Sequence, residues 1–171
     1  MSSVKLDLLK GLKEMFDEEK YAAILREEGV DGAPMNMLSV LFDDFSTESV
    51  EALGEFFFTR EPEGTENDVM VFQSVITIAE NISKEEKELM DKAAAILNFY
   101  IEAGSFCGSL DGETYGYRHT IMLSKDVDVE ILQAMIDQNA AYAIGVSTKY
   151  ADLMMKVKAG IMSLEEIEEL I

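Results

Sequence analysis

The chain has 171 residues and a net charge of −20, from 34 acidic and 14 basic residues. So negative a protein repels phosphate backbones and anionic lipid, which argues against nucleic-acid and membrane partners and favours a basic polypeptide. Apolar residues make up 48% of the chain, enough for a single packed domain over residues 1–171. One cysteine excludes an internal disulfide and the first residues lack the apolar run of a signal peptide, so we expect a cytoplasmic protein.

The N-terminal segment, residues 1–29, is predicted to be helical. Leu8, Leu12 and Phe16 fall on one face at helical spacing. Ile24 and Leu25 continue this pattern, after a kink. The stretch GVDGAPMN at residues 29–36 is rich in turn residues, so the helix is expected to end there.

Three strand-like runs follow, over residues 37–45, 51–60 and 67–79. Apolar residues in these runs alternate between two faces or occupy both of them. The connection EPEGTE at residues 61–66 has the proline and glycine of a hairpin loop. Short connections of this kind join antiparallel strands, so we expect a meander.

A central helix is predicted over residues 84–103, because Ser83 and Glu86 form a capping box before an apolar stripe. We expect this stripe, which includes Leu89, Ala93 and Leu97, to cover the strands. A hairpin up to residue 123 follows, with Asp111 and Gly112 as a type I′ turn, and residues 127–171 form C-terminal helices. The prediction is an α+β fold in the order α-β-β-β-α-β-β-α with a short C-terminal tail helix and a mostly antiparallel sheet of about five strands.

The hairpin contains the only cysteine and the only histidine of the chain. With Asp111 and Gly112 as the turn residues, Cys107 pairs with Gly116, and His119 falls on the opposite face of the sheet. A nucleophilic thiolate–imidazole pair requires hydrogen-bonding distance, so this pair is excluded. The chain also lacks the sequence motifs of zinc, calcium and phosphate sites, and we predict no catalytic residues, no cofactor and no metal.

Short motifs in the second half of the chain resemble the YbjN-like family. They are Ile96-Leu97-Asn98, Gly104-Ser105-Phe106, Tyr117-Arg118 leading into Ile121-Met122-Leu123, Tyr150, and the segment from Gly160 to Glu166. The resemblance covers residues 67–171, and the preceding part agrees in element order alone. It implies the fold of type III secretion chaperones and a non-enzymatic, usually dimeric protein that binds other polypeptides or has a regulatory role.

Two surfaces are predicted to meet a partner or a second copy of the chain. One is the second face of the sheet, which is too apolar to leave in water. It carries Met37, Leu41, Val69, Val71 and Val75. The other is a seam along the long C-terminal helix, although packing against the protein's own sheet would produce the same spacing. This seam includes Leu132, Ile136, Asn139 and Ala143.

We therefore expect a non-enzymatic protein-binding module, chaperone-like or a regulatory adaptor, that recognises a polypeptide partner as a homodimer. Two alternatives stay open at this point: a purely structural role, and a small-molecule enzyme that uses Asp or Glu together with Tyr115 and Tyr117. A deep polar pocket that contains two or more carboxylates with shifted pKa values would favour the enzyme hypothesis. An open, partly apolar sheet face would favour binding.

Overall fold

The computed structural model describes residues 3–48, 50–61, 63–64 and 68–170. Within this part of the chain the helices are α1 (Val4–Glu18), α2 (Lys84–Tyr100), α3 (Val129–Lys158) and α4 (Leu164–Leu170). The strands are β1 (Ala22–Arg26), β2 (Met37–Phe42), β3 (Ala52–Thr59), β4 (Val69–Glu80), β5 (Ser105–Gly108) and β6 (Thr114–Ser124). A short 3₁₀ turn, η1 (Val30–Gly32), lies between β1 and β2.

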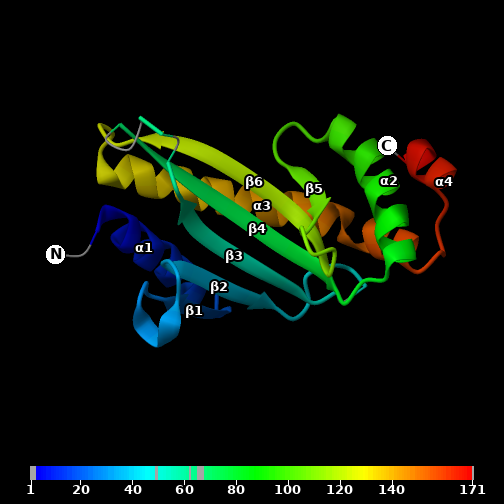
Figure 1. Ribbon diagram of the computed structural model, residues 1–171, viewed down its shortest axis with the longest axis horizontal. Helices are drawn as coiled ribbons and strands as arrows, with labels where there is room; N and C mark the ends of the chain where they lie inside the picture. Colours follow the sequence, from blue (N-terminus) through cyan, green and yellow to red (C-terminus); the bar gives the residue numbers. More distant parts are fainter. Residues whose placement is uncertain (1–2, 49, 62, 65–67, 171) are drawn as a thin grey trace.

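The strands form one antiparallel sheet in the order β1-β2-β3-β4-β6-β5. Figure 1 shows α1 and α3 beside this sheet, whereas α2 and α4 lie next to each other at one end of the molecule. The predicted α+β class and the antiparallel sheet are confirmed. The described residues contain six strands in place of the expected five, because four strands precede α2.

The additional strand is β1, which lies in a segment that was predicted to be helical. The helix α1 ends at Glu18, and Lys20 adopts a left-handed conformation with φ of 67°. The backbone N–H of Tyr21 donates to the carbonyl of Phe16 at 3.0 Å, which is a hydrogen bond of the Schellman type. Such caps usually contain glycine, so a lysine there left no recognisable stop signal. Pairing with β2, from Ala22 opposite Leu41 onward, then makes β1 a strand.

The core lies between α1, α3 and one face of the sheet. The rings of Phe16 on α1 and Phe56 on β3 are 5.3 Å apart, and Ser74 on β4 donates to Asn139 on α3 at 2.8 Å. Phe56 and Ser74 are register partners, so both helices cover the same face. The buried strand residues on this face include Leu38, Val40, Phe42, Phe72 and Ile76.

The prediction that the central helix covers the sheet is wrong, since α3 has this position. The helix α2 packs at the end of the sheet, against β5, α3 and α4 (Figure 1). It buries Met90, Ala93, Ala94 and Leu97, whereas Leu89 of the predicted stripe is 38% exposed. The helix α3 continues through Gly145 without a break and is long enough, at about 45 Å, to run along the sheet.

The predicted hairpin register is confirmed, with Phe106 opposite Tyr117 and Cys107 opposite Gly116. The turn itself differs from the prediction. Gly112 has a φ of 78° and its N–H donates to the carbonyl of Ser109 at 3.0 Å, but the φ of Asp111 is not positive. A type I′ turn requires positive φ at both central residues, so the connection is not of that type.

Candidate functional site

The sheet has a second face, which points away from α1 and α3 and is called the open face below. None of the described helices packs over its centre. The residues that form it are Ala22, Ile24, Arg26, Met37, Ser39, Leu41, Leu53, Glu55, Phe57, Thr59, Val69, Val71, Gln73, Val75, Thr77, Glu80, Ser105, Cys107, Thr114, Gly116, Arg118, Thr120, Met122 and Ser124.

The open face is apolar over much of its extent. Three of its large side chains remain well exposed, Ile24 at 61%, Met122 at 59% and Leu41 at 46%. Val75 in the centre and Val69 at the start of β4 are half-buried among their neighbours. An antiparallel sheet with one face in water normally carries polar side chains there, so this face has the composition of a surface that is covered.

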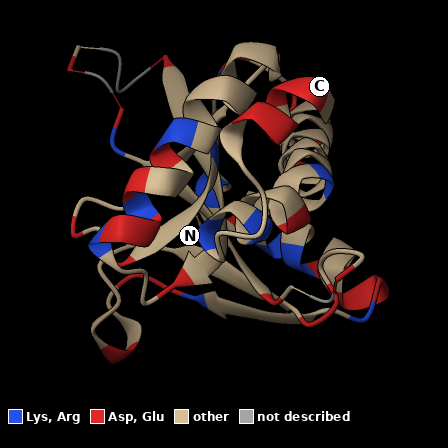
Figure 2. Cartoon of the chain, turned by 90° about the vertical axis from the view of Figure 1, so that its right-hand side faces the viewer, with Lys and Arg blue, Asp and Glu red and all other residues tan. Residues whose placement is uncertain are grey.

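The charge of the open face also differs from that of the whole molecule. The set above contains two acidic residues, Glu55 and Glu80, and two arginines, Arg26 and Arg118, so its charges balance. The chain as a whole has 34 acidic residues among 171. Figure 2 shows many of these along α2 and α4, at the end of the molecule near the C-terminus.

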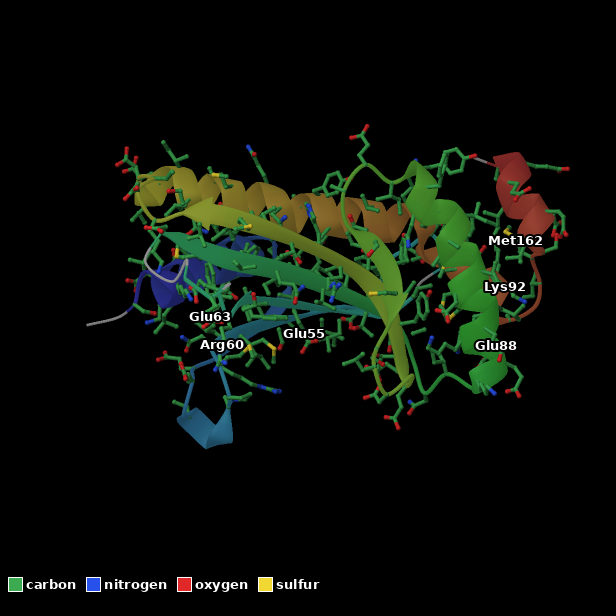
Figure 3. The ribbon with its side chains drawn as sticks, turned by 45° about the horizontal axis from the view of Figure 1, so that its top comes forward. Glu55, Arg60, Glu63, Glu88, Lys92 and Met162 are labelled. Atoms are coloured by element: carbon green, nitrogen blue, oxygen red, sulfur yellow. The ribbon has the colours of Figure 1, made fainter. Side chains whose placement is uncertain are left out.

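The connection between β1 and β2 folds over one end of the open face and encloses a pocket of about 800 Å³. This volume is in the range of small-ligand sites, roughly 300–1,000 Å³. Figures 1 and 3 show the connection as a loop that projects from the sheet. The pocket lies between this loop and the strands, with Val30, Pro34 and Met35 above and Met37, Glu55 and Phe57 below.

Glu55, whose side chain is labelled in Figure 3, is the charged residue that β3 contributes to the lining of this pocket. No described residue forms a hydrogen bond or an ion pair with its carboxylate. Burial raises the pKa of Glu55 above its ordinary value; Arg26 acts to lower it and Glu80 to raise it further. The pocket therefore holds a half-buried carboxylate that lacks a direct partner.

Cys107 and His119 lie on opposite faces of the sheet, as the hairpin register predicts. Cys107 is half-buried on the open side, close to Gly116 and Arg118. The Nδ1 atom of His119 is 2.8 Å from Nδ2 of Asn139 on α3. The two side chains therefore form no catalytic pair.

His119 belongs to a polar group inside the core. The Ser74 hydroxyl donates to Oδ1 of Asn139, so the Asn139 amide directs its N–H₂ group at His119. The ring nitrogen that receives this N–H must be unprotonated, and burial lowers the pKa of His119 below its ordinary value. The geometry and the burial thus both favour neutral His119 in the folded protein.

We expect the free energy of unfolding to fall as the pH is lowered from 7.5 to 5.5. The unfolded chain takes up a proton on this histidine near its ordinary pKa of about 6.5, whereas the folded protein resists protonation to lower pH. Stability is thus lost as the pH falls through the unfolded pKa. Urea unfolding at pH 7.5, 6.5 and 5.5 measures this slope, and His119→Gln should flatten it. An equal slope in both proteins would contradict the assignment.

The predicted interface residues fall into two groups in the structure. Val75 lies in the centre of the open face, Val71 is on this face but is already buried, and Val69 lies at the first position of β4. Met37 lies in the pocket, and Leu41 is exposed near the opposite strand end. The seam on α3 is different, because this helix packs on its own sheet. Its residues Leu132, Ile136, Asn139 and Ala143 are all buried within the subunit. The prediction that this seam meets another chain is therefore wrong.

The two tyrosines of the enzyme alternative are core residues. The hydroxyl of Tyr115 donates to Asp91 at 3.1 Å, and that of Tyr117 donates to the carbonyl of Ala103. Burial is the main cause that raises the pKa of each hydroxyl above its ordinary value. Both hydroxyls are neutral and held by structural contacts.

The described part of the chain has no group of three or more His, Cys, Asp and Glu side chains placed to hold a metal ion. Within it, no helix is both long and apolar enough to cross a membrane.

The sequence analysis did not identify the pocket residues Arg26, Met35, Glu55 and Phe57. Arg26 was assigned to a helix, and Met35 to a turn without a function. The one available signal was the charge of Glu55 between Leu53 and Phe57, in a strand whose alternate positions are apolar. That signal does not show that a loop folds over the residue.

No protein-family model matches this chain, and no curated protein matches its sequence. The resemblance to the YbjN-like family stays a prediction.

Proposed function

We propose that this chain is a non-enzymatic protein-binding module, chaperone-like or a regulatory adaptor, that forms a homodimer and recognises a polypeptide partner. The observation that carries the proposal is the open face, which is largely apolar and whose charged residues balance in a protein of charge −20. Burial of such a face is favourable by about 25 cal/mol for each Å² of apolar surface.

We place the second copy on the centre of the open face because of the charge of that face. Two copies that each carry −20 repel each other, and salt screens this repulsion over about 8 Å at physiological ionic strength. Their approach is least unfavourable through a surface that adds little negative charge. The open face has this property, with Arg26 and Arg118 against Glu55 and Glu80.

The projecting connection between β1 and β2 limits where a second copy fits. It stands above Met37 and Phe57, so a flat partner surface cannot lie over β1, β2 and β3 at that end of the face. The second copy is therefore placed over β4 and β6, where Val75 and Met122 lie. The pocket remains beside this area and is available to the polypeptide partner.

Light scattering at micromolar concentration tests this proposal. The expected mass of the wild-type protein is near twice the 19.1 kDa of one chain. Met122→Glu should produce a folded monomer whose thermal midpoint no longer depends on protein concentration, because it places a charge in an apolar interface at a side chain that is exposed in the single subunit. Higher salt should strengthen the wild-type dimer, since it screens the repulsion between the copies.

Phe99→Glu is the matched control for this substitution. Phe99 lies on α2, at the other end of the molecule, and is 84% exposed, so the variant adds the same charge away from the open face. It should remain dimeric. A monomeric wild-type protein would refute the assignment of the second copy to this face. The same conclusion would follow if the two single variants Met122→Glu and Val75→Glu both remained dimeric.

A further inference from the structure

The pocket under the β1–β2 connection combines an apolar lining with adaptable side chains. Phe57 provides a flat surface at its base, and Met35 and Met37 lie on opposite sides of the space. Methionine side chains are flexible and polarisable, so they adjust to ligands of different shape. The lining therefore suits the aliphatic part of an extended segment.

The charges of the pocket select for a cation. Its lining contains Asp31 and Glu55 against one basic residue, Arg26; the third acid in the lining, Glu27, lies 4.0 Å from the Lys10 ammonium on α1 and is already paired. A purely apolar ligand would cover Glu55 and remove its contact with water without supplying a partner, which is unfavourable. A ligand with a positive group avoids this cost and also gains from the field of the acidic protein.

We propose that this pocket takes a lysine or arginine side chain from an extended segment of the partner polypeptide. The alkyl stem of that side chain lies on Phe57 and Met37, and its charged end forms an ion pair with Glu55. Long basic side chains bind in this way because the stem is apolar and the head group is charged. The inference rests on the proposed function in one respect, namely that the partner is a polypeptide.

The absence of tryptophan from the chain allows a direct binding test. The probe is a blocked pentapeptide of sequence Leu-Arg-Trp-Arg-Leu, whose fluorescence reports burial without background from the protein. Its counterpart has glutamate in both arginine positions. The wild-type protein should bind the basic peptide at least tenfold more tightly than the acidic one, and added salt should weaken this binding.

Glu55→Gln keeps the shape of the side chain and removes its charge. It should weaken binding of the basic peptide about tenfold, the usual effect of losing a hydrogen bond to a charged group. Glu88→Gln is the matched control, because Glu88 is an exposed acid on α2, far from the pocket (Figure 3). The Glu88→Gln variant should bind the basic peptide as tightly as the wild type does. The thermal midpoint of Glu55→Gln should be no lower than that of the wild type, since a half-buried charge is removed.

Several outcomes would overturn the inference. Equal affinity of Glu55→Gln and the wild type for the basic peptide would show that Glu55 does not bind the ligand. Absence of binding at 1 mM peptide, which corresponds to a binding free energy weaker than about 4 kcal/mol, would exclude the site. Competition by spermidine at concentrations equal to those of the peptide would identify a small cation as the ligand. The mass of the wild type and of Met122→Glu tests the dimer independently, so failure of the pocket and failure of the proposed function are distinguishable.

Discussion

Gly116→Ala is expected to lower the free energy of unfolding by roughly 3 kcal/mol, because it creates a clash between two strands in the centre of the sheet. A Cβ atom on Gly116 would lie 2.3 Å from the carbonyl oxygen of Ile76 on β4. That atom belongs to the backbone of a central strand and cannot move aside as a side chain would. The β4–β6 register shifts here, between Thr77 and Ala79, and the two backbones approach closely.

The thermal midpoint of Gly116→Ala should fall by roughly 6–12 °C for a domain of this size. Gly145→Ala provides the control, because Gly145 lies exposed inside α3 and a Cβ there meets no atom within 4 Å. This second variant should be more stable than the wild type by about 0.5–1 kcal/mol, owing to the better helix propensity of alanine. Equal midpoints for the two variants would show that the backbones are not in contact at Gly116.

Leu97→Ala should lower the free energy of unfolding by about 2–5 kcal/mol, the usual cost of emptying a buried leucine site. Leu97 has no exposed surface in the structure and lies on the side of α2 that packs into the core. The cavity would lie between α2 and its neighbours at the end of the sheet. Urea unfolding followed by circular dichroism measures this loss.

Leu89→Ala distinguishes the two possible faces of α2. Leu89 belongs to the stripe predicted from the sequence, but it is 38% exposed in the structure. Its replacement should cost less than about 1 kcal/mol, since little apolar surface returns to water. A larger loss for Leu89→Ala than for Leu97→Ala would mean that α2 buries the opposite face.

The features that sequence predicted correctly depend on residues close together in the chain. The capping box at the start of α2 is formed as predicted, with Ser83 and Glu86 exchanging hydrogen bonds across three positions. The hairpin register follows from the position of its turn, and strand alternation then separates Cys107 from His119. These are local relations, so the folded environment did not change them.

The features that sequence missed depend on which distant segments meet. Residues 22–26 have a pattern compatible with helix or strand, and pairing with β2 made them a strand. Both α2 and α3 have an apolar stripe, and their sequences do not indicate which of the two helices packs on the sheet. The seam on α3, with Leu132 and Ile136, was therefore assigned to a partner although it packs on the protein's own sheet.

The open face depends both on the local sequence pattern and on long-range packing. Sequence alternation alone determined that Val69, Val71 and Val75 share a face, because side chains of a strand alternate at a period of two residues. Only the tertiary structure decided that α1 and α3 both pack on the other side and that the β1–β2 connection encloses Glu55. The reason is physical: the side on which a helix or loop packs depends on burial summed over many long-range contacts, which no local pattern encodes.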